Sequence, residues 1–170
     1  MSRPDEEFRS FVAVRAAALH RSAYLLCGDW YLAQDLVQEA LAKAYSHWGR
    51  VARADSPEAY VRRIVVNEAN RHWRRHRHRA GVVDIRHDRP VPDGVAPDAS
   101  DDVVVRAGIF QALLALPVRQ RATVVLRYLD GLTERETAAV LNCSEGTVKS
   151  QTSRALATLK TYLAREEAIR

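Results

Sequence analysis

The amino-acid sequence predicts an all-α protein made of two small helical domains joined by a flexible acidic linker. Only 7 Gly and 6 Pro occur among its 170 residues, and three of the prolines (Pro90, Pro92 and Pro97) fall between residues 81 and 102. On either side of that interval, Ala, Leu, Arg and Val are abundant, and apolar residues recur every three or four positions, as one face of a helix requires. A hydrophobic content of 47% is enough to bury a core.

The first 80 residues predict three helices. Apolar spacing places the first at about residues 5–27, before Gly28-Asp29, and the second at about 33–48, before Gly49. The third begins at Ser56-Pro57-Glu58, which supplies an N-cap, a proline at the first helical position and a favourable carboxylate in the first turn. The expected inward-facing residues are Phe8, Phe11, Val12, Leu19, Ala23 and Leu26, then Ala33, Leu36, Val37, Ala40, Leu41, Ala44 and Trp48, then Val61, Ile64, Val65, Ala69 and Trp73.

The helical pattern disappears between Gly81 and Asp102, where proline, glycine and six Asp predict an extended linker. We therefore expect one domain at residues 1–80, the linker at 81–102 and a second domain at 103–170. Formal charge follows the same division: 14 Lys/Arg against 9 Asp/Glu in the first part, 2 against 6 in the linker, and 10 against 6 in the last part. Two basic domains on either side of an acidic linker suggest two contacts with a polyanion.

The second domain predicts four helices. Val105, Ile109, Ala112, Leu113 and Leu116 share one face of the first, and Pro117 can open the next, which closes at Asp130-Gly131. Thr133 and Glu136 form a capping box for a short helix that ends near Leu141. Ser144 then caps a last helix, reaching about Tyr162. The expected inward residues of the second and fourth helices are Val118, Ala122, Val125, Leu126 and Leu129, and Val148, Thr152, Ala155, Leu159 and Leu163.

Residues 133–159 have the features of a DNA-binding helix-turn-helix, in which the second helix enters the major groove with its N-terminus first. Ala138 is small where the two helices must approach closely, and Leu141 and Val148 can fix their angle. An ordinary helical hairpin with a solvated polar face is the alternative. The candidate DNA-binding residues, able to bond phosphates or base edges, are Ser144, Gly146, Thr147, Lys149, Ser150, Gln151, Ser153 and Arg154.

The third helix is a second candidate for nucleic-acid binding. Seven Lys/Arg stand between Tyr60 and Ala80 against the single Glu68, which is more positive charge than a solvated helix end needs. Trp73 follows the apolar stripe, so we expect it to pack in the core rather than to stack on a base. The candidate DNA-binding residues on this helix are Arg63, Asn67, Asn70, Arg71, Arg74 and Arg77.

Other chemistries receive little support from the sequence. His72 and His76 have the spacing of metal ligands on a helix, but no acidic base lies between them and the neighbouring arginines would repel a cation, so we expect no metal. Cys27 and Cys143 lie in different expected domains and do not indicate a disulfide framework. The acidic start of the chain does not resemble a signal peptide and no apolar run could span a bilayer, which favours a cytoplasmic protein.

Three segments, in this order, resemble a sigma factor of the extracytoplasmic-function (ECF) group, specifically the sigma-E-like subfamily of actinobacteria. Asp35-Leu36-Val37-Gln38-Glu39-Ala40, continuing to Trp48, resembles the region 2 helix that binds core polymerase. Ser56 to Ile64, continuing to Trp73-Arg74-Arg75, resembles the segment that reads and melts the promoter −10 element. Leu116 to Arg121, Leu126-Arg127-Tyr128 and Gly146 to Ser150 resemble region 4, which reads the −35 element.

The resemblance implies roles for residues that pattern alone leaves undecided. It assigns core-polymerase binding to Asp35, Leu36, Gln38, Glu39 and Trp48, although a polar stripe of this kind is also typical of a solvated face. It places the linker along the RNA path, and it places capture of a flipped-out base at the loop of about residues 50–56, beside Asn67 and Arg71. Few aromatic residues accompany Tyr60 and Trp73, which argues against strong general melting.

The implied function is that of a transcription initiation factor, not an enzyme, that needs no cofactor and joins RNA polymerase core as a monomer at a small set of promoters. An anti-sigma factor is left open as a further partner. Two other classes remain. A stand-alone repressor or activator would explain residues 131–154 but not the stripe from Asp35 to Trp48. A nucleic-acid-processing enzyme would use His72 and His76, and its turnover would depend on a metal.

Overall fold

The computed structural model describes residues 3–77 and 101–169, and every regular element within these ranges is helical, which confirms the predicted fold class. Residues 81–100 of the expected linker lie outside the described residues, and α5 already begins at Asp101. No described helix is both long and apolar enough to cross a membrane. The elements are α1 (Arg3–Cys27), α2 (Trp30–Ser46), α3 (Trp48–Val51), α4 (Pro57–Arg77), α5 (Asp101–Ala115), α6 (Val118–Val124), the π-helix η1 (Val125–Leu129), α7 (Glu134–Leu141) and α8 (Glu145–Ile169).

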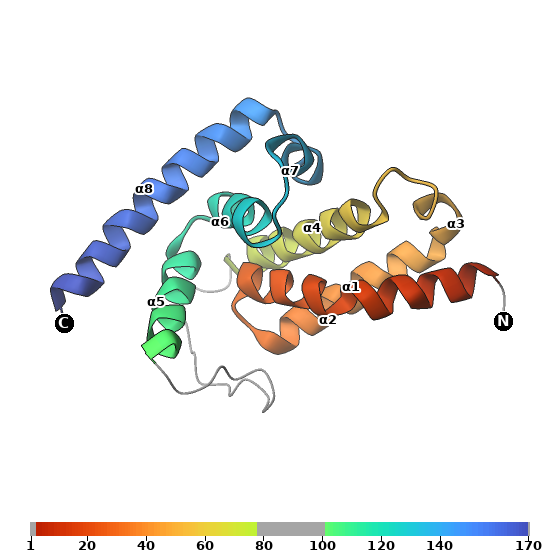
Figure 1. Ribbon diagram of the computed structural model, residues 1–170, viewed down its shortest axis with the longest axis horizontal. Helices are drawn as coiled ribbons and strands as arrows, with labels where there is room; N and C mark the ends of the chain where they lie inside the picture. Colours follow the sequence, from red (N-terminus) through yellow and green to blue (C-terminus); the bar gives the residue numbers. More distant parts are fainter. Residues whose placement is uncertain (1–2, 78–100, 170) are drawn as a thin grey trace.

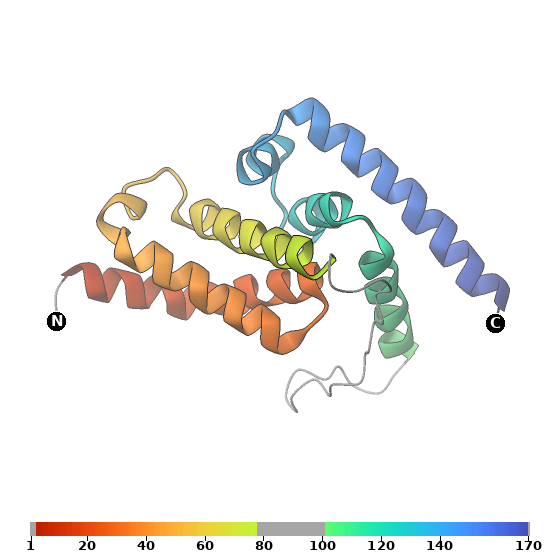
Figure 2. The ribbon, with the colours of Figure 1, turned by 180° about the vertical axis from the view of Figure 1, so that it is seen from behind.

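The N-terminal helices α1, α2 and α4 pack side by side as a bundle, and the short α3 closes one end (Figures 1 and 2). The apolar stripes predicted from the sequence meet along the bundle axis, where Leu19, Ala33, Ala40 and Val61 are fully buried. One helix was expected at about residues 33–48, but the structure has α2 beginning at Trp30 and the separate short α3 beginning at Trp48. Local signals set the starts of α2 and α4. Asp29 caps α2 by accepting a hydrogen bond from the Leu32 amide at 2.8 Å, and the Ser56 hydroxyl accepts one from the Ala59 amide at 3.1 Å in the first turn of α4.

In the C-terminal half, α6 and α7 lie between α8 and the N-terminal bundle, and α5 lies beside both α1 and α8 (Figure 1). Three residues predicted to be buried here are exposed instead: Ile109 at 46%, Leu129 at 54% and Leu163 at 38%. Leu129 was placed on the inner face of a continuous α-helix, but the chain changes to a π-helix at Val125. The wider turn rotates the following residues off that face.

The other two exposed positions have causes of their own. On α5 the buried side chains are those of Ala112, Leu113 and Leu114, and Ile109 lies one turn nearer the start of the helix than Leu113. Helix α8 was predicted to end near Tyr162 but continues to Ile169, and its last turns run past the helices that cover Val148 and Ala155 (Figure 1).

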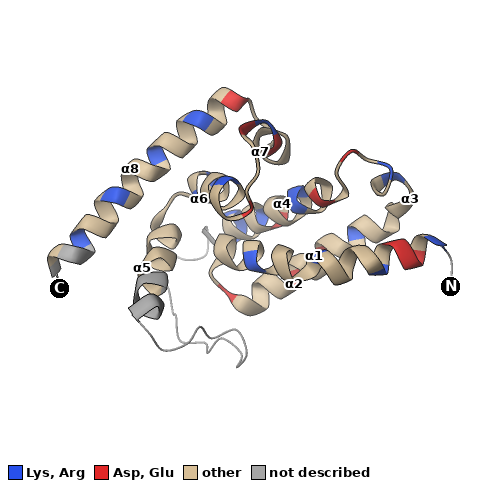
Figure 3. Cartoon of the chain, in the orientation of Figure 1, with Lys and Arg blue, Asp and Glu red and all other residues tan. Residues whose placement is uncertain are grey.

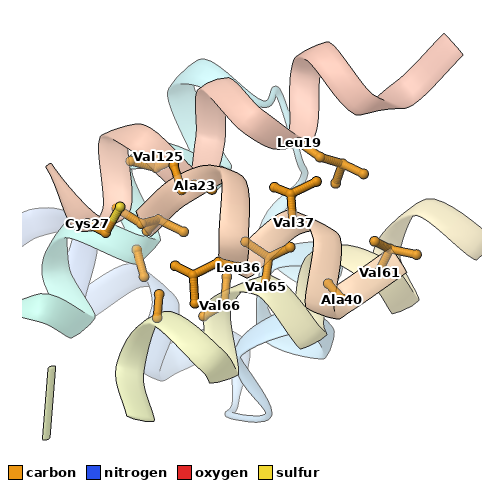
Figure 4. Close-up of a cluster of buried hydrophobic side chains, with 14 of the residues drawn as sticks. Leu19, Ala23, Cys27, Leu36, Val37, Ala40, Val61, Val65, Val66 and Val125 are labelled. Carbon is orange, nitrogen blue, oxygen red and sulfur yellow. The ribbon is translucent and has the colours of Figure 1, made fainter. Parts of the chain in front are cut away.

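The two halves share a hydrophobic core. Val125, Leu126 and Val140 from the C-terminal half join Leu19 and Val65 of the bundle in one buried cluster (Figure 4). Nearby, Phe110 stacks on Tyr24 with ring centroids 4.8 Å apart. Gly28 has φ +77°, a backbone conformation that favours glycine, and a Cβ added there would lie 2.9 Å from the end of the Leu114 side chain, which would have to shift.

Two buried arginines also join the halves. Arg121 of α6 donates hydrogen bonds to the carbonyls of Leu26 at 2.8 Å, Leu114 at 2.7 Å and Leu116 at 3.1 Å, and so satisfies one free carbonyl at the end of α1. Arg62 of α4 forms ion pairs with Asp130, which follows η1, and with Glu58 at 2.6 Å. The side chains of Arg62 and Asp130 are only 7% and 8% exposed. We call Arg62 and Asp130 the interdomain ion pair.

Candidate nucleic-acid interface

Helix α2 exposes the polar stripe found in the sequence. Because Ala33, Val37 and Ala40 face the core, Asp35, Gln38 and Glu39 face outward on the opposite side. The remaining two residues expected to bind a partner, Leu36 and Trp48, are each only 5% exposed. In this structure Leu36 and Trp48 support the surface from beneath and do not form part of it.

An aromatic cluster explains the position of Trp48. Its ring lies 5.1 Å from Phe8 and 5.2 Å from Phe11, centroid to centroid. An open hollow of about 570 Å³ lies against this cluster. Of the loop expected to capture a flipped base, residues 50–56, only Arg50 lines the hollow, so the geometry does not gather that loop into one pocket. The other lining residues are Pro4, Asp5, Tyr45, Ser46, His47, Trp48 and Gly49.

Helix α4 presents a basic outer face. The sequence-predicted residues Arg63, Asn67, Arg71 and Arg74 are exposed and Asn70 is half-buried, while Val61, Val65, Val66 and Ala69 fill the inner face. The side chain of Arg77 lies outside the described residues, as does that of His76. Trp73 packs as expected: it is half-buried, and the Arg121 guanidinium lies 5.1 Å from its ring centroid.

Two charged residues of α4, Arg62 and Glu68, are buried, and neither has a role predicted from sequence. Glu68 accepts a hydrogen bond from Lys43 of α2 at 2.7 Å and lies 3.2 Å from the Arg71 guanidinium. Lys43 also donates a hydrogen bond to Glu39 at 2.7 Å. The hydrogen bonds that Lys43 donates raise its pKa, the one to Glu39 most strongly and the one to Glu68 next. Spacings of three and four residues could have suggested the pairs within one helix, but no local pattern indicates the contact between α2 and α4.

Helices α7 and α8 form the helix-turn-helix. The capping box is present, because the Thr133 amide donates to Glu136 at 2.7 Å and the Glu136 amide donates to the Thr133 hydroxyl at 3.2 Å. Asn142 ends α7 in the left-handed conformation, with φ 52°. The Ser144 hydroxyl then caps α8 by accepting from the Thr147 amide at 3.1 Å. Of the residues predicted to set the angle between the helices, Ala138 and Val148 are buried and Leu141 is half-buried; Ala155 of α8 is buried as well.

The outer face of α8 carries the polar residues expected to contact DNA. Ser144, Gly146, Lys149, Ser150, Ser153 and Arg154 are exposed, and Thr147 and Gln151 are half-buried. Basic residues recur along the length of the helix (Figure 3). Lys149 is 3.6 Å from Glu134 of α7, a distance at which a phosphate could compete for it. A Cβ at Gly146 would meet no atom closer than 3.8 Å, so the packing of the protein itself does not require glycine there.

Comparison with known proteins identifies these two helical units. Residues 11–79 match the family model for Sigma-70 region 2, and residues 106–159 match the one for Sigma-70, region 4. The RNA polymerase sigma-E factor of Streptomyces avermitilis is 38% identical over 157 residues, covering 92% of this chain and 85% of that protein. The chain belongs to the sigma-70 family. Within it, the ECF RNA polymerase sigma factor SigM of Mycobacterium tuberculosis is 34% identical, over 85% of this chain and 71% of that protein.

Solved structures agree with this assignment. The sigma factor RpoE of Bartonella quintana, solved in complex with the anti-sigma factor NepR, aligns with a TM-score of 0.76 at 26% identity, covering 94% of this chain and 98% of that one. CnrH in complex with the cytosolic domain of CnrY shares the fold, with a TM-score of 0.68 at 22% identity, 95% of this chain and 90% of that one. As an ECF sigma factor, the protein is a transcription initiation factor that acts with RNA polymerase core in promoter recognition.

Proposed function

We propose that three exposed faces of this sigma factor each bind a different target. Asp35, Gln38 and Glu39 of α2 bind core polymerase, the basic face of α4 contacts the −10 element, and the outer face of α8 contacts the −35 element. The observation that carries the proposal is that the three sets of polar side chains singled out in the sequence lie on the outer sides of their helices, where a partner can reach them, while the opposite sides are buried. Carboxylates on α2 suit a basic protein surface, whereas Arg, Lys and amide side chains on α4 and α8 suit DNA.

The proposal extends to organisation and chemistry. Residues 1–80 act as the region 2 domain, residues 103–170 as the region 4 domain, and residues 81–102 as the linker between them. The protein performs no catalysis itself and uses no cofactor; it works as one copy in the holoenzyme, in the cytoplasm. An anti-sigma factor is proposed as a further partner, because the Bartonella relative that aligns over 94% of this chain was solved bound to one.

The proposed DNA contacts require the two halves to separate. Promoter elements named −10 and −35 are centred about 25 base pairs apart, or about 85 Å of duplex at about 3.4 Å per base pair. A compact chain of 170 residues has a radius of gyration of only about 15 Å. The 22 linker residues can span up to about 75 Å when extended. The docked arrangement therefore represents a form that opens before both elements are bound.

Run-off transcription with purified core polymerase tests the proposed function. Core polymerase with this protein should initiate from specific sites on fragmented genomic DNA, whereas polymerase alone should not. If the protein binds core in native gels but supports initiation on no fragment, the proposal is wrong. Binding to DNA without binding to core would favour a stand-alone repressor or activator.

Asp35→Arg tests the face on α2. Charge reversal should weaken binding to core polymerase at least tenfold, because it removes a charge-assisted hydrogen bond and adds repulsion to a basic surface. Binding of the full chain to −35 DNA should stay unchanged. Glu7→Arg is the matched control, since Glu7 is an exposed acidic residue of α1 outside the proposed faces. Equal loss of core and DNA binding in Asp35→Arg would contradict the assignment.

A further inference from the structure

Glu68 is an acidic residue in the middle of the helix proposed to contact promoter DNA. It is only 8% exposed, although α4 carries Arg63, Arg71 and Arg74 on its outer face. A buried carboxylate loses its hydration and repels the phosphates of a nearby nucleic acid. The positive charge of α4 therefore does not explain why an acidic residue is buried in this helix. The reason lies in the contacts that Glu68 makes.

Those contacts form a continuous chain from one proposed surface to another. Glu39 of the polymerase-facing stripe accepts a hydrogen bond from Lys43 at 2.7 Å, and Lys43 donates a second to Glu68 at 2.7 Å. The other oxygen of Glu68 accepts from Arg71 Nη1 at 3.3 Å. Lys43 and Arg71 are 44% and 50% exposed at the side chain, so the buried carboxylate anchors two long, solvent-accessible cations.

The geometry at Arg71 leaves part of its guanidinium available. Only Nη1 contacts Glu68, and within the part of the chain that the structure describes, Nε and Nη2 have no acceptor. A guanidinium presents its donors in a rigid planar fork that matches a phosphate. Fixing one corner of that fork removes much of the rotational freedom that an exposed arginine otherwise loses when it binds.

We propose that Glu68 is a positioning residue for promoter binding: it holds Arg71 in place, so that the free edge of the guanidinium meets a DNA phosphate. Lys43 fixes Glu68 from the side of α2, and this contact ties the proposed polymerase-binding helix to the proposed −10 helix. The inference rests on the proposed contact between α4 and the −10 element.

Glu68→Gln tests the proposal, because a purely electrostatic effect and a positioning role predict opposite changes in promoter affinity. Removing a negative charge next to DNA should tighten binding if charge alone matters. If Glu68 positions Arg71, promoter affinity should instead fall on the order of tenfold, the effect of losing one charge-assisted hydrogen bond. The slope of log K against log salt should also flatten by about 1, the change for one lost phosphate contact. The measurement uses holoenzyme and a promoter fragment recovered by run-off transcription.

Two controls separate positioning from a general structural role. Glu7→Gln removes one exposed negative charge from α1, far along the chain from α4, and should leave promoter affinity unchanged. In an Arg71→Ala background, Glu68→Gln should cause no further loss, because the residue through which it acts is gone. Should Glu68→Gln fail to fold, Glu68→Asp in the same cycle shortens the carboxylate and provides the same comparison.

The outcomes distinguish a failure of the role proposed for Glu68 from a failure of the proposed function. Tighter or unchanged binding by Glu68→Gln, or a loss of equal size in the Arg71→Ala background, would overturn the role of Glu68 and leave the proposed function intact. Wild-type holoenzyme that finds no promoter at all would overturn the proposed function itself.

Discussion

At the scale of single residues, the structure contains two buried arginines that are stabilised in different ways. Burial disfavours the charged form of Arg62, but Asp130 and Glu58 outweigh this cost and raise its pKa. Arg121 meets only backbone carbonyls among its hydrogen-bond acceptors, and burial lowers its pKa to about 10. Arg121 remains charged at neutral pH, where it caps the end of α1 and covers Trp73.

Cys27 provides a test at the same scale. Burial raises the pKa of its thiol to about 11, against an ordinary value of 9.0, so alkylation of Cys27 should stay slow until the pH approaches 11. The folded protein holds this proton more tightly than the unfolded chain does between pH 9 and 11. The contribution of the protonated Cys27 thiol to stability is therefore complete below pH 9 and is lost as the pH rises through 11.

The measurement compares single-cysteine variants. Iodoacetamide rates for Cys143→Ser, which leaves Cys27, should be far below those for Cys27→Ser, which leaves the half-buried Cys143. The free energy of unfolding of wild type relative to Cys27→Ala should decline by about 2–3 kcal/mol between pH 9 and pH 11. Rapid alkylation of Cys27 at pH 8 would contradict the burial seen here.

At the scale of secondary-structure elements, the helices begin where short side chains satisfy free amides. Asp29, Ser56, Thr133 and Ser144 each accept a hydrogen bond from an amide in the first turn of their helix. Hydrogen bonds from the Thr133 amide and hydroxyl lower the pKa of Glu136. These local contacts explain why the starts of the helices capped by Ser56, Thr133 and Ser144 were predicted correctly from sequence. The cap at Asp29 and the register change at the π-helix η1 were not predicted.

Thr133→Ala tests the capping box of α7. Removing the hydroxyl should cost about 1 kcal/mol in the free energy of unfolding, because the Glu136 amide loses its acceptor. Glu136 has a lowered pKa, so its stabilising effect is present above its unfolded pKa and is lost as the pH falls through the folded value. Urea unfolding at pH 7 and at pH 3 should show a smaller difference between Thr133→Ala and wild type at the lower pH. Thr158→Ala is the control, because Thr158 bonds only the carbonyl of Arg154 within α8.

Arg154→Ala tests the recognition face of α8. If Arg154 contacts a base edge, the substitution should cost about 1–3 kcal/mol at the −35 element and relax sequence preference there. Lys149→Ala should instead weaken binding to all sequences alike and reduce the salt slope by about 1. Lys160→Ala removes the same charge about three turns beyond Lys149 on the same helix and is the matched control. A uniform loss for Arg154→Ala would identify it as a phosphate contact.

At the scale of the whole molecule, the two halves are docked through a shared core and through the interdomain ion pair of Arg62 and Asp130. Asp130 also accepts a hydrogen bond from the Ser22 hydroxyl at 2.6 Å, so that α1, α4 and the segment after η1 meet at one polar point inside an apolar interface. Charges buried in this way contribute little net stability when paired, but they are costly when one partner is lost.

Asp130→Ala should therefore shift the molecule toward its separated form. The loss leaves Arg62 with only Glu58 and a serine hydroxyl, at a cost of about 3–5 kcal/mol to the docked state. Small-angle scattering should show a larger radius of gyration than wild type, while helical content by circular dichroism stays similar. Asp55→Ala, an exposed acidic residue before α4, is the control. An unchanged radius together with lower unfolding stability would show that the halves unfold together rather than separate.

The sequence by itself determined most of the helices, the caps at Ser56, Thr133 and Ser144, and the polar faces, because helical periodicity and capping are local properties of the chain. Asp35, Glu39, Arg63, Arg71, Lys149 and Arg154 all lie on the exposed sides of the helices predicted for them. The ordered motifs also indicated the family that the comparisons confirm.

Only the tertiary structure decided which charged residues are buried and how the halves meet. Arg62 and Asp130 are 68 positions apart in the sequence, and Lys43 and Glu68 lie on different helices, so no local pattern could pair them. Leu36 and Trp48 are buried, as their apolar spacing predicts, so the structure does not place them on the surface that the family resemblance assigned to polymerase binding. The contacts that join distant segments depend on the packing of the whole chain, and they are the ones that tie Glu68 to α2 and hold the two halves together.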